Sequence, residues 1–285
     1  MSIAYLNGSF LPLEEARISP MDRGFLFADG VYEVIPYYGG KSFGLDGHLK
    51  RLQRSLREIK LSVDLSLEEW KSLVDLLVSK NEGGDLSVYL QVTRGAYAKR
   101  DHAFPEKINP TIFLMVSPIA SPLAADVTKA EGISAITVPD IRWDRCDIKS
   151  ISLLPNILLK QQAAAEGAQE AILVRDNLVT ECAAANVFAV KNGTIYTPAK
   201  DEHILGGITR DIIIKLASEH GIPLEEISMD ASFLEQADEI WISSSTREIV
   251  PVIKLNGHAV GSLQPGSIWK QMASYYQANK KHIFT

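Results

Sequence analysis

A chain of 285 residues and 31.4 kDa is longer than one hydrophobic core usually organises, so the length predicts two lobes. Hydrophobic residues make up 46% and charged residues 22% of the chain, which argues against a disordered, fibrous or membrane protein. Lysine and arginine number 29 against 35 acidic residues, and a net charge of -6 argues against nucleic acid or an anionic membrane as partner.

The first 120 residues predict one α+β domain. Two hairpins are expected, because turn-forming Asn7-Gly8 and Gly39-Gly40 each lie between strand-like residues. Helical spacing of leucines then predicts a helix from Asp46, which we expect to cap its first turn, and a second helix from Ser66 with Glu69 as its capping box. The remaining expected strands are Val31–Ile35, Leu86–Thr93 and Thr111–Val116.

Two prolines, Pro118 and Pro122, stiffen the segment Ser117–Ala125, which we interpret as an interdomain linker with a boundary near residue 121. The C-terminal domain, 121–285, mixes strands and helices without strict alternation, so we predict an α+β fold in both domains. Its expected strands are Ile133–Val138, Ala171–Val174, Val187–Val190, Thr194–Thr197, Glu239–Ser243 and Val250–Ile253. Its expected helices are Leu158–Glu166, Thr209–Gly221 and Ile268–Lys280.

The cysteines and histidines give no sign of a metal or disulfide framework. Cys146 and Cys182 are too few for either, and no two of the six histidines are spaced to share a metal. The opening residues MSIAYLNGSF lack a basic stretch followed by an apolar segment. We therefore expect a cytoplasmic protein without a metal. The sequence also lacks the dinucleotide, P-loop, nucleophile-elbow and zinc-protease motifs.

Two residues have side chains that could take part in a reaction through a Schiff base, one as the amine and the other as a charged partner of a ring. Lys149 precedes the uncharged run from Ile151 to Leu159, and an amine that loses hydration is more readily neutral and able to form a Schiff base with an aldehyde. Glu181 precedes three alanines that would let a flat ring approach, and its carboxylate could hold a pyridine nitrogen protonated. Each has an ordinary alternative, an ion-paired surface lysine and a turn glutamate.

Two further segments are suited to binding an anion. In Leu205-Gly206-Gly207-Ile208-Thr209-Arg210, two glycines precede an expected helix start, where backbone N–H groups favour negative charge. The run Ser243-Ser244-Ser245-Thr246 offers hydroxyl donors after an apolar strand, although such runs are commonly plain turns.

These residues stand in an order that resembles a known family along nearly the whole chain. The chain is similar to the class IV aminotransferases, which are fold-type IV pyridoxal-5'-phosphate enzymes, and most closely to the D-amino acid aminotransferases among them. The segments that carry the resemblance are Asp22-Arg23-Gly24, Asp29-Gly30-Val31-Tyr32-Glu33, Val92-Thr93-Arg94-Gly95, Asp140-Ile141-Arg142-Trp143, Cys146-Asp147-Ile148-Lys149-Ser150, Thr180-Glu181, Gly207-Ile208-Thr209-Arg210 and Glu248-Ile249-Val250-Pro251-Val252.

The resemblance implies a two-domain fold with the active site between the domains and the cofactor lysine in the C-terminal one. Lys149 would bind pyridoxal 5'-phosphate as a Schiff base and move the proton, while Glu181 would pair with the pyridine nitrogen. The implied phosphate-binding residues are Arg51, Ile208, Thr209 and Ser245, and Leu205 would pack on the ring.

The resemblance also implies a homodimer. Tyr32, Arg100 and His102 match the group that traps the substrate carboxylate, with Arg100 and His102 reaching in from the partner subunit. A guanidinium, an imidazole and a phenol are charge-assisted donors suited to that anion. The expected reaction is ping-pong transfer of the amino group of D-amino acids such as D-alanine to a 2-oxo acid such as 2-oxoglutarate.

One loop departs from the pattern and leaves more than one activity open. Cys182-Ala183-Ala184-Ala185 stands where the D-amino acid enzymes usually carry small hydroxyl residues, and the loop is reminiscent of 4-amino-4-deoxychorismate lyases of the same fold. The pair Arg100 and His102 favours the transaminase. The sequence is also compatible with a branched-chain-type aminotransferase and with a non-catalytic small-molecule-binding protein.

Overall fold

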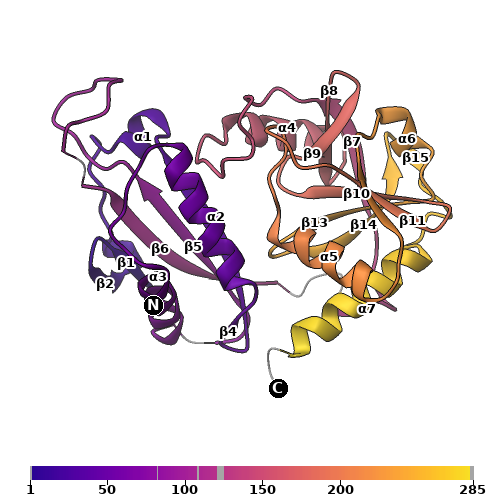
Figure 1. Cartoon of the computed structure of the whole chain (residues 1–285), viewed down its shortest axis with the longest axis horizontal. Helices are drawn as coiled ribbons and strands as arrows, with labels where there is room; N and C mark the ends of the chain where they lie inside the picture. The colour runs from indigo at the N-terminus through magenta and orange to yellow at the C-terminus, as the bar shows by residue number, and fades with distance from the viewer. Residues whose placement is uncertain (1, 82, 108, 121–124, 283–285) are drawn as a thin grey trace. The chain divides into compact units, whose positions relative to one another are not determined.

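The computed structural model describes residues 2–81, 83–107, 109–120 and 125–282. The chain divides into two compact units, which we call the first unit (residues 1–120 and 148–152) and the second unit (residues 121–147 and 153–285) (Figure 1). Of the expected linker, residues 121–124, and with them the expected boundary, lie outside the described residues. Among the described helices, none combines the length and apolar character needed to cross a bilayer.

The first unit is built on a six-stranded sheet in which every neighbouring pair is antiparallel. In sheet order the strands are β2 (Ser9–Pro12), β1 (Ile3–Leu6), β6 (Thr111–Pro118), β5 (Leu86–Thr93), β3 (Gly30–Tyr38) and β4 (Lys41–Ser42). Both predicted hairpins are present, because Asn7, Gly8, Gly39 and Gly40 adopt the positive φ that a tight hairpin turn requires.

Helices α2 (Leu45–Glu58) and α3 (Leu67–Ser79) pack their apolar faces on this sheet (Figure 1). The predicted capping box of α3 is confirmed, since Ser66 and Glu69 bond reciprocally. The prediction that Asp46 caps α2 is wrong. Gly44, with φ of 76°, is the N-cap, and Asp46 lies within the first turn, where it pairs with Lys71 at 3.0 Å.

The segment 148–152 groups with the first unit, whereas the resemblance placed its lysine in the C-terminal domain. Main-chain bonds account for this. Tyr32 N donates to Lys149 O at 3.0 Å, Ile151 N donates to Gly30 O at 3.1 Å, and Val31 and Ser150 form an antiparallel bridge. The segment thereby lies along the edge of β3 where that strand begins. The short elements η1 (Leu13–Glu15) and α1 (Arg23–Phe27) complete the first unit.

The second unit is built on a nine-stranded mixed sheet, which agrees with the predicted α+β class. In sheet order the strands are β12 (Leu224–Ile227), β11 (Thr194–Pro198), β10 (Asn186–Lys191), β13 (Glu239–Ser244), β14 (Glu248–Leu255), β7 (Ile133–Pro139), β8 (Glu170–Arg175) and β9 (Leu178–Cys182), and β15 (His258–Ala259) pairs with β14. The β11–β12, β14–β7 and β7–β8 pairs are parallel.

The described residues of the second unit form four α-helices, and three of them were predicted. They are α4 (Leu154–Ala165), α5 (Ile208–Glu219), α6 (Ala231–Glu235) and α7 (Ser267–His282). Helix α4 begins four residues before its predicted start at Leu158, with Pro155 in its first turn, where proline is tolerated. Helices α5 and α7 lie side by side and contact β13 (Figure 1). Helix α5 therefore packs against both α7 and the sheet.

Candidate active site

Lys149 in the first unit is held by its backbone, and its side chain lies on an aromatic ring. Its main-chain N–H donates to Ser55 Oγ of α2 at 3.3 Å, and its carbonyl accepts from Tyr32. Its Nζ lies 4.1 Å from the centroid of the Tyr32 ring. An ammonium over a phenol ring is attracted by the ring's negative face. The structure therefore brings together two of the predicted site residues, the amine and the phenol.

A buried carboxylate orients Arg51. Arg51 Nε and Nη2 donate to the two oxygens of Glu33 at 2.8 Å each, and His48 Nδ1 lies 2.7 Å from Glu33 Oε2. Burial alone would raise the pKa of Glu33, but the charge of Arg51 and the bonds from Arg51 and His48 outweigh it and lower that pKa to about 2. Burial, together with the charges of Arg51 and Lys149, lowers the pKa of His48 despite its bond to Glu33.

Arg100 and His102 lie in the exposed connection between β5 and β6 of the first unit. Both contact the ring of Phe27 in α1. The guanidinium carbon of Arg100 is 5.0 Å from the centroid of that ring, and the imidazole of His102 is 5.1 Å from it. One aromatic ring thus holds the two residues expected to trap a carboxylate close together.

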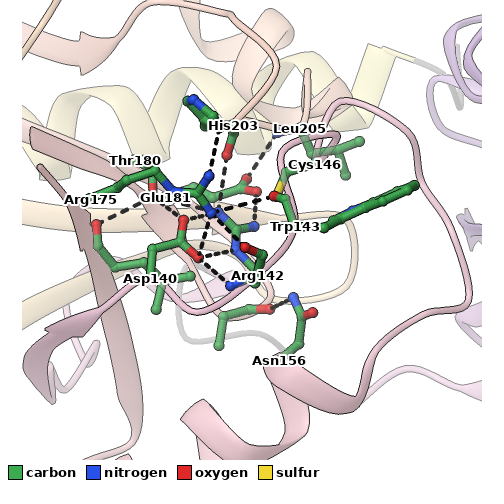
Figure 2. Close-up of polar contacts among 12 residues, drawn as sticks. Asp140, Arg142, Trp143, Cys146, Asn156, Arg175, Thr180, Glu181, His203 and Leu205 are labelled. Carbon is green, nitrogen blue, oxygen red and sulfur yellow. Dashed lines mark hydrogen bonds and ion pairs between the residues drawn. The ribbon is translucent and has the colours of Figure 1, made fainter.

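Glu181 is buried in β9 of the second unit, and its carboxylate pairs with a buried arginine (Figure 2). Arg142 Nη1 donates to Glu181 Oε1 at 2.5 Å. Asn186 Nδ2 and the main-chain N–H of Leu205 donate to the other oxygen, Oε2, at 3.2 and 3.3 Å. A buried carboxylate with an arginine and two N–H donors is stabilised in its charged form.

Arg142 is itself fixed from the opposite side, as Figure 2 shows. Its Nε and Nη2 donate to the two oxygens of Asp140 at 2.9 Å each, and Nη2 also donates to His203 O at 3.0 Å. Although burial raises the pKa of Asp140, the bond to Arg142 and its charge hold that pKa below its usual value. Burial opposes the charge on Arg142, yet Asp140 and Glu181 raise its pKa above the usual range. The guanidinium is therefore a permanent cation between two carboxylates.

Asn186 connects Glu181 to the turn that precedes α5. Its Nδ2 donates both to Glu181 and to Leu205 O, the latter at 2.8 Å. Its Oδ1 lies 2.0 Å from the position that a Cβ on Gly207 would occupy, so only glycine fits there. Asn186 also pairs with Ser243 in the β10–β13 ladder, which places the end of β13 beside the same turn.

The start of α5 has no side-chain cap. Its N-cap, Gly207, provides no side-chain hydrogen bond, and the first turn of a helix leaves backbone N–H groups without an intrahelical partner. Ile208 and Thr209 occupy that turn. On the face of the sheet that Asn186 shares, the buried Ser243 Oγ has no hydrogen-bond partner among the described residues. Ser245 follows in the turn after β13.

The loop that departs from the family pattern is fixed by backbone bonds. Cys182 N donates to Ala185 O at 2.7 Å, and Asn156 Nδ2 donates to Ala183 O at 2.7 Å. Burial raises the pKa of the Cys182 thiol well above its usual value, and the nearby Glu170 and Glu181 act in the same direction. The thiol is thus neutral, and the loop has no side-chain hydroxyl.

Each unit holds one part of the predicted site. The first unit contains Tyr32, Arg51, Arg100, His102 and Lys149, and the second contains Glu181, Leu205, Ile208, Thr209 and Ser245. Sequence reasoning gave no role to Arg142 or Asn186, which contact Glu181 directly. Arg142 lies inside a segment that carries the family resemblance, and Asn186 closely follows another such segment. Their position in or near these segments could have indicated a functional role.

The family of the chain follows from comparison with known proteins. The model of the family described as "Amino-transferase class IV" matches residues 30–255, and the chain belongs to this family. It is therefore an aminotransferase by family, as the sequence resemblance predicted.

Two sequence relatives and one solved structure illustrate the similarity. The "D-alanine aminotransferase" of Staphylococcus epidermidis is 40% identical over 278 residues, which is 97% of each chain. That of Bacillus licheniformis is 41% identical over 95% of this chain and 94% of its own. Among solved structures, the branched-chain amino acid aminotransferase of Escherichia coli has a TM-score of 0.89 and 25% identity over 97% of this chain and 93% of that one.

Proposed function

We propose that the chain is a pyridoxal-5'-phosphate-dependent transaminase that moves the amino group of D-amino acids to a 2-oxo acid. The observation that carries the proposal is about 40% identity, over nearly the full length, to enzymes named D-alanine aminotransferase. Contacts within each unit also support the roles that we propose for individual residues.

The second unit offers matching groups for a phosphorylated pyridine. A carboxylate that is paired with Arg142 and stays charged suits a pyridinium N–H, so Glu181 would hold the ring nitrogen. The uncapped start of α5 suits a phosphate, which would accept from the N–H groups of Ile208 and Thr209. Ser245 would add a donor, and Leu205 would contact the ring. In the first unit, Arg51, already oriented by Glu33, would add a positive charge to the phosphate site.

Lys149 is the proposed acid and base. When bound, the cofactor supplies an aldehyde for imine formation and an electron-withdrawing ring. Nζ of Lys149 would take the proton from Cα of the amino acid and return it at C4' of the cofactor. The Tyr32 ring beneath Nζ limits the directions from which the amine can act. The reaction would be ping-pong, since the amino donor must leave as a 2-oxo acid before the acceptor binds.

Substrate stereochemistry is assigned to the carboxylate trap. A guanidinium and an imidazole both held on Phe27, with the Tyr32 phenol, would fix the carboxylate and so select which Cα–H bond faces Lys149. We propose that Arg100 and His102 serve the partner subunit of a homodimer. The free thiols of Cys146 and Cys182 suit a reducing compartment, and we propose the cytoplasm.

A substrate panel tests the proposal. Purified enzyme with cofactor is mixed with 2-oxoglutarate and either D-alanine or L-alanine, and pyruvate is measured. We expect pyruvate from the D form only. Pyruvate from the L form alone would identify a branched-chain-type enzyme instead.

The lyase is kept as the second candidate, because the hydroxyl-free loop from Cys182 to Ala185 favours it. Pyruvate released from aminodeoxychorismate without any amino acceptor would decide for the lyase.

A further inference from the structure

Arg23, in α1 of the first unit, binds the backbone of the loop that carries the two predicted trap residues. Its Nη1 donates to Asp101 O at 2.5 Å and to Ala103 O at 3.3 Å, and its Nη2 donates to His102 O at 3.2 Å. Three consecutive carbonyls therefore accept from one guanidinium. The side chain is only 4% exposed, so these bonds are largely shielded from water.

Two further charged residues keep Arg23 in place. Asp29 Oδ2 accepts from Arg23 Nε and from Arg94 Nε at 2.8 Å each. Burial would raise the pKa of Asp29, but its bonds to Arg94 and Arg23 and their charges hold it below the usual value. Arg94 also donates to Ile59 O at 2.7 Å, and its guanidinium lies 3.7 Å from the Phe104 ring centroid. The loop is thus anchored at residues 101–103 and at residue 104.

The ring of Phe27 joins Arg23 to the trap residues. The guanidinium carbon of Arg23 lies 4.9 Å from its centroid, at nearly the same distance as that of Arg100, and the His102 imidazole packs against the same ring. Aromatic rings attract cations, so Phe27 gives both trap side chains a fixed partner.

The neighbours of Arg23 allow it little freedom. Asp22 caps α1 by accepting from Gly24 N at 2.7 Å, and it also accepts from the hydroxyls of Thr93 and Thr111. A Cβ on Gly24 would lie 2.3 Å from a methyl carbon of Thr93, so α1 is pressed against β5. The residues on both sides of Arg23, Asp22 and Gly24, are therefore fixed by their contacts.

We propose that Arg23 is a positioning residue for the substrate carboxylate, which it controls through the loop backbone and the Phe27 ring. The inference rests on the proposed function, in which Arg100 and His102 bind the carboxylate in the partner's site. An exposed connection without helix or strand loses conformational freedom on binding unless it is already ordered. The three bonds from Arg23 provide that order before the substrate arrives.

The test compares Arg23→Gln and Arg23→Lys with the native holoenzyme. Glutamine removes the positive charge and the set of N–H donors with which the guanidinium binds several carbonyls. Lysine keeps a cation for Asp29 but cannot reach three carbonyls together, which guards against a variant that fails to fold. We expect the KM for D-alanine to rise about tenfold or more in Arg23→Gln and less in Arg23→Lys, with kcat within about twofold. An unchanged KM in either folded variant would overturn the proposal. A kcat that falls by as large a factor as KM rises would also overturn it.

Arg17 offers a matched control. Its Nη1 also donates to two carbonyls, Glu14 O and Ala16 O, but in an exposed turn of the same unit. Arg17→Gln should leave KM and kcat unchanged. An equal rise of KM in that variant would mean that any lost arginine has this effect, and the inference would fail.

Mixed dimers separate positioning of the loop from a general structural role. A differently tagged Arg23→Gln subunit is paired with a Lys149→Ala subunit. The site with the intact lysine then receives its loop from a subunit with native Arg23, so we expect a native KM. Retention of the raised KM would show that Arg23 acts within its own subunit and would contradict the proposal.

Arg100→Gln separates the role of Arg23 from the binding of the carboxylate itself. Arg100→Gln must itself raise the KM for D-alanine if Arg100 binds the carboxylate. A raised KM in Arg100→Gln with a native KM in either folded Arg23 variant overturns only the role of Arg23. A native KM in Arg100→Gln overturns the carboxylate trap and, with it, the inference.

Discussion

The amide oxygen of Asn186 occupies the space that a side chain at position 207 would need. Only 2.0 Å separates Oδ1 from the position of a Cβ on Gly207. Asn186 cannot readily move away, because its Nδ2 is bonded to Glu181 and to Leu205 O. The group proposed to hold the pyridine nitrogen and the turn proposed to hold the phosphate are therefore connected through one side chain.

Gly207→Ala should disturb both ends of the proposed cofactor site. The new methyl group would push Asn186 off its partners, and such overpacking typically costs about 1–3 kcal/mol. We expect a lower Tm of the apoenzyme and weaker binding in a titration with pyridoxal phosphate. The neighbouring Gly206→Ala is the control, because its Cβ would meet nothing closer than 3.6 Å. Equal behaviour of the two variants would contradict the packing argument.

Arg142→Gln should strongly destabilise the second unit. The change removes the cation that lies between the buried carboxylates of Asp140 and Glu181, and removing one partner of a buried pair costs about 3–5 kcal/mol. Urea unfolding of the apoenzyme measures the loss.

Arg145→Gln is the matched control for Arg142, since Arg145 pairs with Asp147 at 3.0 Å but is 43% exposed. Loss of such a pair costs about 0–1 kcal/mol. A loss for Arg142→Gln no larger than for Arg145→Gln would show that the buried network contributes little.

Acid should weaken the first unit through Glu33. A carboxyl whose pKa is lowered from 4.5 to about 2 in the folded protein stabilises it fully above pH 4.5, and this contribution is lost as the pH falls toward 2. A shift of that size corresponds to about 3 kcal/mol. Tm measured against pH should therefore fall more steeply for the native chain than for Glu33→Gln.

Glu68→Gln serves as the control for Glu33, because the Glu68 side chain is 79% exposed. Its Tm profile should follow the native one over the same pH range. If Glu33→Gln followed the native profile as well, the buried pair of Glu33 with Arg51 would not be the source of the acid sensitivity.

Arg100→Gln should raise the KM for D-amino acids far more than it weakens cofactor binding. Removing one partner of a charge pair buried by the bound substrate costs about 2–5 kcal/mol, whereas Arg100 has no proposed contact with the cofactor. Steady-state kinetics and a cofactor titration separate the two effects. Lys99→Gln, which changes the adjacent exposed cation, should alter neither; a similar KM in both variants would remove Arg100 from the site.

Local patterns predicted most of the secondary structure. Turn dipeptides and the capping box at Ser66 act within a few residues, so the elements beside them could be read from the sequence. Strand β9, which carries Glu181, was not predicted, although Asp176 and Asn177 form a turn with positive φ before it. That pair was a usable hairpin signal.

Contacts between distant parts of the chain could not be predicted. The contact of Arg142 with Glu181 joins residues 39 positions apart, and that of Arg23 with His102 joins residues 79 apart. The grouping of Lys149 with the first unit likewise depends on bonds to Tyr32 and Ser55. Spacing along the sequence carries no information on such pairings, and only the family resemblance pointed to these segments.

Reduction of the holoenzyme with borohydride tests whether Lys149 binds the cofactor as an imine. Reduction converts an imine between the cofactor and a lysine into a stable amine, and peptide mapping then locates the pyridoxyl group. We expect one labelled peptide, with the label on Lys149, and no label in Lys149→Ala. A label on another lysine, or none in protein reconstituted with pyridoxal phosphate, would contradict it.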